Sequence, residues 1–179
     1  MRDKKVLFIT QASMIAALYV VLTLLANALG LANYAIQIRF SEALTILPFF
    51  TPAAIPGLTI GCLLSNLLTG CMPLDILFGS LATLLGAVGT YALRRFLWAA
   101  PIPPILANTL IVPFILAYVY QFDGSVPYFM LTVGIGELLS CGVLGMVLLG
   151  ILMKYRNVIF QSGVSDKKTL PAKKTDRLS

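Results

Sequence analysis

The chain has 179 residues, of which 59% are hydrophobic and only 11% are charged, with 13 Lys and Arg against 7 Asp and Glu. This composition excludes an ordinary soluble domain and predicts an all-α membrane protein with room for about five or six crossings. Because the chain has no His and its 3 Cys are widely spaced, histidine-dependent hydrolases, zinc sites and a disulfide framework are not expected.

Apolar blocks predict six helices, at 6–29, 41–50, 52–68, 74–93, 101–120 and 126–153. The first block is too long for the apolar core of a cleaved signal peptide, which usually has about 7–15 residues, so a retained helix is expected. The stretch 41–70 would be about 45 Å long as one helix, more than a hydrocarbon core of about 30 Å requires. Pro48, Pro52 and Pro56 also interrupt it, and a helical hairpin turning near residues 50–52 is expected.

The distribution of Lys and Arg indicates how the predicted helices, including this hairpin, are oriented in the membrane. With a cytoplasmic N-terminus, Arg94, Arg95, Lys154 and the basic C-terminal stretch all lie inside, and Arg39 alone lies outside. A single crossing at 41–70 would place most of these cations outside. Six transmembrane helices with both termini in the cytoplasm are therefore predicted for residues 1–160, as one domain of a multi-pass protein of the cell membrane. Residues 161–179 are predicted to form a basic, disordered cytoplasmic tail.

Three carboxylates are the main candidates for function. Glu42 and Asp75 are expected at the external starts of helices, where N-terminal capping is the alternative role. Glu137 is expected roughly 16 Å along the last helix from Val126, near the bilayer centre. A carboxylate there needs a partner, a proton or a polar cavity, so a binding role is expected and a protonated structural hydrogen bond is the alternative.

Neutral polar residues add further candidates. Asn66 and Asn108 are expected to line the same cavity as the carboxylates and Arg39, with interhelical hydrogen bonding as the alternative. Tyrosines are expected at the outer rim, where an aromatic belt is the alternative. These tyrosines are Tyr34, Tyr118, Tyr120 and Tyr128, and Tyr34 is the best candidate for binding because it precedes Arg39 in the same loop.

A stripe of small residues, Ala12 and Ala16 with Ala17, lies toward the predicted cytoplasmic end of the first helix. Such a stripe allows another helix to approach closely. It indicates either packing within this chain or docking of a separate membrane protein. The sequence contains no GxxxxGK[ST] loop, so any ATP-driven transport would need other chains.

The sequence also resembles the queuosine-precursor transporter (QueT) family, whose members are substrate-binding S components of energy-coupling factor transporters. The resemblance is carried by IQIRFSEALTILPFFTPAAIPG at 36–57, GCLLSNLL at 61–68, LDILFGSLATLLGA at 74–87, APIPPILANTLIV at 100–112 and GIGELLSCGVLG at 134–145. It implies a six-helix S-component bundle with an outward-facing pocket gated by two loops. It also implies that Ala12 and Ala16 dock a transmembrane coupling protein that is driven by two ATPases.

The substrate implied by this resemblance is a 7-deazaguanine, such as 7-aminomethyl-7-deazaguanine or queuine. A carboxylate can accept the adjacent N–H and NH₂ donors of the guanine edge, and a second carboxylate suits the aminomethyl cation. Asn66, Asn108 or Gln37 could donate to the ring carbonyl. The expectation is a binding subunit that is not an enzyme, with no metal or cofactor of its own and no nucleic-acid partner, since ATP is used by the partner ATPases. Two alternatives are an S component for another vitamin-like ligand and a self-sufficient proton- or cation-coupled carrier that uses Glu137.

Overall fold

A computed structural model describes residues 2–30 and 39–159 of the chain, with side chains over 4–30 and 39–155. Every regular element in these residues is helical, which confirms the all-α class. The helices are α1 (Arg2–Ala28), η1 (Phe40–Phe49), α2 (Ala54–Leu68), α3 (Pro73–Ala92), η2 (Leu97–Ala99), α4 (Ile102–Phe114), η3 (Ile115–Val119), α5 (Val126–Glu137), η4 (Leu138–Leu144) and α6 (Gly145–Ile159). Both η1 and η2 are 3₁₀ helices, whereas η3 and η4 are π-helical.

Four helical stretches of the described chain are long and apolar enough to cross a membrane. They are Lys4–Ala28, Pro73–Ala92, Leu97–Val119 and Val126–Tyr155. Two further apolar helices, η1 with 10 residues and α2 with 15, are shorter. These lengths support a membrane protein, and the count of six crossings remains a prediction.

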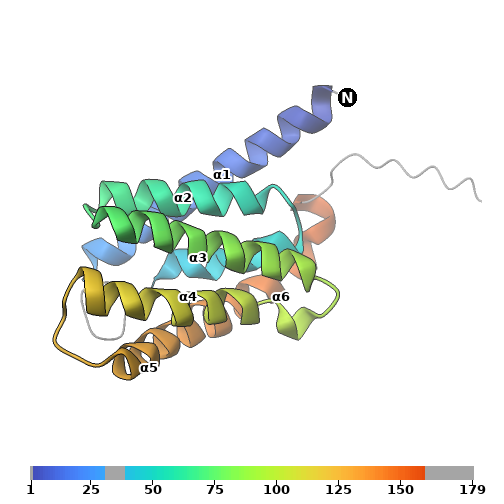
Figure 1. The fold of residues 1–179 in the computed structure, drawn as a ribbon. Coiled ribbons are helices and arrows are strands. Elements are labelled where there is room, and N and C mark those ends of the chain that lie inside the picture. Colours follow the sequence, from blue (N-terminus) through green and yellow to red (C-terminus); the bar gives the residue numbers. More distant parts are fainter. Residues whose placement is uncertain (1, 31–38, 160–179) are drawn as a thin grey trace, which may run out of the picture.

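The short helix η1 forms the centre of the bundle. Residues 41–48 are all buried, and η1 contacts α1, α2, α3, η4 and α6. Helices α1 to α5 follow one another in chain order, each α-helix packed against the next, and α5 continues through η4 into α6, which also contacts η1 (Figure 1). The expected break between the two arms is present, because η1 ends at Phe49 and α2 begins at Ala54. The first arm is nevertheless a buried core segment and not a lipid-facing helix.

Helices α1 and α2 meet along a seam of small residues. A Cβ atom added to Gly57 would lie 2.7 Å from the Ala12 carbonyl oxygen, and one added to Gly61 would lie 2.8 Å from the Tyr19 Cβ and 3.1 Å from the Ala16 Cα. Both glycines are therefore required for the close approach of the two backbones. The close contact between Tyr19 and Gly61 along this seam fixes the position of Tyr19 relative to α2.

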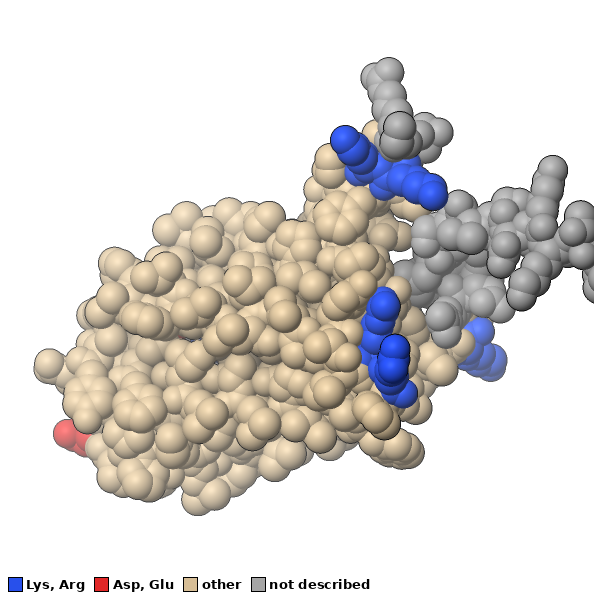
Figure 2. All heavy atoms as spheres, turned by 45° about the vertical axis from the view of Figure 1, so that its right-hand side comes forward, with Lys and Arg blue, Asp and Glu red and all other residues tan. Residues whose placement is uncertain are grey.

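The two ends of the bundle differ in charge. Lys4, Lys5, Arg94, Arg95 and Lys154 are exposed, and basic side chains gather at one end of the molecule, with acidic atoms visible at the other (Figure 2). We call the end that carries these cations the basic rim. The opposite end is formed by the C-terminal end of α1, the turn between α2 and α3, and the loop between η3 and α5 (Figure 1).

Candidate functional site

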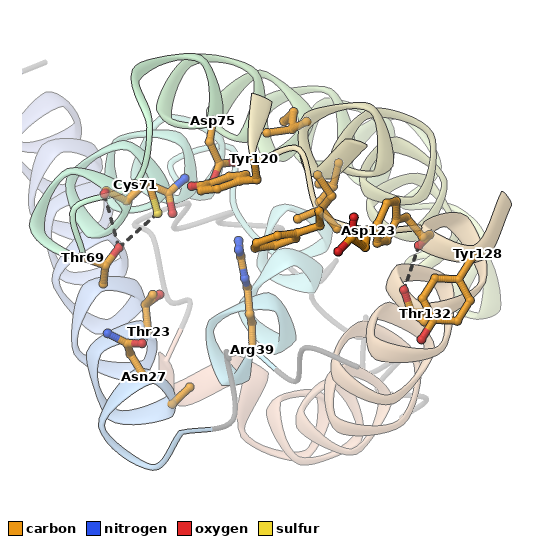
Figure 3. Close-up of a pocket in the computed structure, with 17 residues that line it drawn as sticks. Thr23, Asn27, Arg39, Thr69, Cys71, Asp75, Tyr120, Asp123, Tyr128 and Thr132 are labelled. Carbon is orange, nitrogen blue, oxygen red and sulfur yellow. Dashed lines mark hydrogen bonds between the residues drawn. The ribbon is translucent and has the colours of Figure 1, made fainter. Parts of the chain in front are cut away.

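A cavity of about 500 Å³ lies at the end of the bundle opposite the basic rim, and we call it the outer cavity. Its walls are Thr23, Ala26, Asn27, Arg39, Asn66, Thr69, Cys71, Asp75, Val112, Ile115, Leu116, Tyr120, Phe122, Asp123, Tyr128, Phe129 and Thr132. Figure 3 shows Arg39 extending from the start of η1 into the middle of the cavity, with Asn27 and Tyr128 on opposite sides. The volume is in the usual range for small-molecule sites, about 300–1,000 Å³.

Tyr120 bridges two helix connections at the rim of this cavity. Its hydroxyl donates to the Asp75 Oδ2 at 2.8 Å and accepts the Met72 backbone N–H at 3.2 Å. Its ring stacks on Phe122, with ring centroids 5.5 Å apart. Burial, together with the hydrogen bond to the Asp75 carboxylate, holds the pKa of the Tyr120 hydroxyl above its ordinary value. The bridge ties the start of α3 to the end of η3.

A second, much smaller hollow of about 20 Å³ adjoins the outer cavity, and we call it the inner chamber. Its walls are Arg39, Asn108, Val112, Val133 and Glu137. Arg39 and Val112 also line the outer cavity. The Arg39 side chain is thus part of the wall between the two spaces.

Behind the inner chamber lies a buried hydrogen-bond network centred on Asn108. The Asn108 Nδ2 donates to the Glu137 Oε1 at 3.0 Å and to the Glu42 Oε2 at 3.4 Å. The Tyr19 hydroxyl donates to the Glu42 Oε1 at 2.6 Å, and the Cys141 thiol donates to the Glu137 Oε2 at 3.3 Å. The side chains of α1, η1, α4, α5 and η4 thereby meet at one point, and burial strengthens each of these bonds.

The backbone ahead of η1 is fixed to the last long helix. The Arg39 backbone N–H donates to the Ser140 Oγ at 3.2 Å, and the single proton of the Cys141 thiol is shared between the Glu137 carboxylate and the Glu42 carbonyl oxygen, each at 3.3 Å. Ser140 and Cys141 belong to η4, and π-helical turns often occur at functional sites. The wider π turn presents two consecutive polar side chains to η1.

Comparison with known sequences places the chain in a family. Residues 9–154 match the profile of the family described as QueT transporter. The chain belongs to the QueT transporter family. The "Queuosine precursor transporter QueT" of Lactococcus lactis subsp. cremoris (strain MG1363) is 36% identical over 97 residues, which are 54% of this chain and 57% of that relative. The match therefore spans little more than half the length of the relative. No solved structure matches the chain significantly.

Most of the site residues expected from the sequence converge in this QueT-family structure. Arg39, Asn66 and Asp75 line the outer cavity, and Glu137 and Asn108 line the inner chamber. Their roles in binding remain predictions. Tyr34 and Gln37 lie outside the described residues, so the structure does not place them.

Glu42 lies in the first turn of a helix, η1, as the sequence predicts, but it is buried there and not exposed at an outer edge. The sequence placed Glu42 at an external helix start, level with Asp75, whereas its side chain is only 2% exposed and shares Asn108 with Glu137. The physical reason is that η1 begins inside the bundle, so its first turn lies among other helices and away from the outer edge. Asp75, by contrast, does lie in the first turn of α3, at the cavity rim.

Several residues of the site were not singled out from the sequence. Tyr19, Cys141 and Ser140 join the buried network, and Thr23 and Asn27 of α1 line the outer cavity. A partial signal existed for α1, because Tyr19, Thr23 and Asn27 follow one another at four-residue spacing and so lie on one helix face. Of the tyrosines expected at the outer rim, Tyr120 and Tyr128 line the cavity, whereas Tyr118 does not and is 71% exposed.

One group of side chains is close enough to hold a metal ion among the described residues. Oxygen or sulfur atoms of Glu42, Glu137 and Cys141 all lie within 4.8 Å of one another. The Cys141 thiol already donates to Glu137, and Asn108 already donates to both carboxylates. These bonds account for the arrangement with no ion, and the absence of a metal remains a prediction.

Proposed function

We propose that this chain is the substrate-binding S subunit of an ATP-driven energy-coupling factor importer for a queuosine precursor, a 7-deazaguanine. The observation that carries the proposal is the outer cavity, a space of small-molecule size in a chain of the QueT transporter family. Because the sequence has no phosphate-binding loop, transport driven by ATP would use partner ATPases. In this proposal the chain is not an enzyme and holds no cofactor.

The proposed orientation places the basic rim in the cytoplasm and the outer cavity toward the outside of a prokaryotic plasma membrane. The exposed cations Lys4, Lys5, Arg94, Arg95 and Lys154 support it through the positive-inside rule. The four long apolar helices, with η1 and α2 as two shorter arms, would then give six crossings and cytoplasmic termini. Arg39 is the one cation at the cavity end among the described side chains, which suits a role in binding.

The cavity walls suit a flat ring with polar edges. Phe122, Tyr128 and Phe129 offer aromatic faces against which a purine-like ring can lie. Asp75 can accept ring N–H groups, and Asn66 can donate to a ring carbonyl. This combination supports a 7-deazaguanine, and another vitamin-like ligand with donors and acceptors on a flat ring is the alternative.

The surface that docks the coupling protein is proposed on α1. Ala16 is buried at the seam with α2, and Ala12 is half-buried there, which is the internal packing that the sequence left open. Ser13 and Ala17 lie beside this stripe and are exposed. Docking through the Ala12 and Ala16 stripe therefore requires that the partner contact its exposed edge.

Reconstitution tests the proposal. The purified chain should bind 7-aminomethyl-7-deazaguanine without ATP, and mass spectrometry should find a deazaguanine in protein purified from cells that contain one. Vesicles should accumulate the ligand only after the coupling protein and ATPases are added. If an unrelated vitamin co-purifies and deazaguanines do not bind, the proposed assignment of a 7-deazaguanine as substrate is wrong.

A second candidate function is a self-sufficient carrier coupled to protons. The buried pair of Glu42 and Glu137 favours it, because a carboxyl group inside a membrane is the usual proton site of such carriers. The same vesicles decide between the two. Uptake by the lone chain, driven by an imposed proton gradient and unaffected by ATP, would establish that the chain is a carrier. It would exclude the proposed role as a subunit of an ATP-driven importer.

A further inference from the structure

The inner chamber has room for one small polar group. Its volume of about 20 Å³ exceeds the roughly 10–15 Å³ that a single water requires. A purine-like ring therefore cannot enter it, whereas the terminal group of a short arm can. Glu137 and Asn108 line this space, and Arg39 forms part of the wall toward the outer cavity. An arm can pass when the flexible Arg39 side chain moves aside.

The buried network around this chamber has an excess of acidic groups. Glu42 and Glu137 accept hydrogen bonds from the same Asn108 amide, and Arg39 is the cation of this region. If both carboxylates are ionised, one negative charge is left over. An uncompensated charge is costly inside a bundle that crosses a membrane, so one proton shared by the pair restores neutrality in the ligand-free protein.

The titratable and polar groups around the pair and Arg39 come from several neighbouring helices. They are Tyr19 of α1, Cys62 of α2 next to Tyr19, Asp75 of α3 near Arg39, Asn108 of α4, and Thr45 and Cys141 on η1 and η4. Arg39 is the only cation in this set of described side chains. The outer cavity adds the carboxylate Asp123 and no further cation from the described residues. The combined site therefore favours a ligand that brings positive charge.

We propose that the inner chamber takes the protonated amine of a short aminomethyl arm, and that this ammonium replaces the proton held by Glu42 and Glu137. The ring then stays in the outer cavity, and Arg39 returns to the wall of the inner chamber, so that the ammonium and the guanidinium together balance the two carboxylates. The exchange is balanced, because the ligand arrives as an ammonium and one proton leaves the carboxyl pair for the solvent. This inference rests on the proposed function, and it selects 7-aminomethyl-7-deazaguanine over queuine, whose amine carries a bulky ring.

Titration calorimetry on the full chain tests the exchange. Two ligands of matched size are compared: 7-aminomethyl-7-deazaguanine, which is a cation at neutral pH, and 7-hydroxymethyl-7-deazaguanine, which is neutral. Each is titrated at one pH in two buffers of different ionisation enthalpy, so that the difference in heat counts protons. The amine should release about one proton per ligand, the alcohol none, and the amine should bind about tenfold or more tightly.

Glu137→Gln removes one carboxylate and should abolish this preference, with affinity for the amine reduced about tenfold or more and affinity for the alcohol kept. Tyr118→Phe, at an exposed residue that lines neither space, serves as the control and should keep both the preference for the amine and the proton release. The inference is overturned if wild-type protein binds both ligands equally or binds the amine without releasing a proton, although the proposed function would stand. If neither deazaguanine binds to well-folded protein, both the proposed function and this inference fail.

Discussion

Two buried regions of this molecule are held together by opposite means, and Tyr19 belongs to both. At the seam between α1 and α2, backbones meet because Gly57 and Gly61 have no side chains. At the network, carboxylates, an amide, a thiol and a hydroxyl meet through hydrogen bonds. The Tyr19 Cβ lies against Gly61, and its hydroxyl donates to Glu42. The seam thus fixes by shape where the network can form, while the network joins distant helices through polar side chains.

The largest expected effect comes from breaking the seam. Gly61→Val would place a Cβ 2.8 Å from that of Tyr19 and 3.0 Å from the Ala16 carbonyl oxygen, so α1 must move away from α2. We expect a loss of stability of about 3 kcal/mol or more, together with loss of ligand binding because Tyr19 is displaced from Glu42.

Thermal unfolding in detergent measures this loss. Gly150→Val is the matched control, since nothing lies within 4 Å of a Cβ at Gly150, and it should change stability by less than about 0.5 kcal/mol. Equal behaviour of the two variants would show that the seam does not require a glycine.

The next largest effect comes from the network. Glu137→Gln keeps the shape of the side chain and removes its charge, so the protein should fold while its affinity for a deazaguanine amine falls by about 1.5–3 kcal/mol. Calorimetry measures the affinity, and the unfolding temperature reports on the fold. Unchanged affinity in folded protein would exclude Glu137 from binding, whereas loss of the fold would favour a structural role.

The smallest effect is expected at the cavity rim. Tyr120→Phe removes the hydroxyl that bonds Asp75 and Met72, and stability should fall by about 0.5–1.5 kcal/mol. Tyr118→Phe is the control, because Tyr118 is 71% exposed. If both variants match the wild-type protein in thermal unfolding, the Tyr120 bridge contributes nothing to the rim.

The seam and the network were predictable from the sequence to different degrees. The small residues Ala12 and Ala16 signalled a close helix contact, although sequence could not say that the partner was α2 of the same chain. Helix breaks at prolines were also visible, and the break after Phe49 is where the pattern predicted it. These are local features, governed by residues near one another in the chain.

The network depends on contacts between residues far apart in sequence, and there prediction was weaker. Glu42 and Glu137 were both singled out, but their sharing of Asn108 was not foreseen, because nothing local shows that η1 is a 3₁₀ helix starting inside the bundle. Cys141 was read only as an unpaired cysteine. Its hydrogen bond to Glu137 depends on the π-helical turn η4. Nothing in the residues of this segment indicated such a turn.

The length of α1 links the membrane itself to the site. Its 27 residues span about 40 Å, roughly 10 Å more than a typical hydrocarbon core, so α1 must tilt or project beyond the bilayer. Its far end carries Thr23 and Asn27, which line the outer cavity. A thicker bilayer should draw α1 more upright and shift this wall of the cavity. Acyl-chain length would then tune ligand affinity with no change in any residue that touches the ligand.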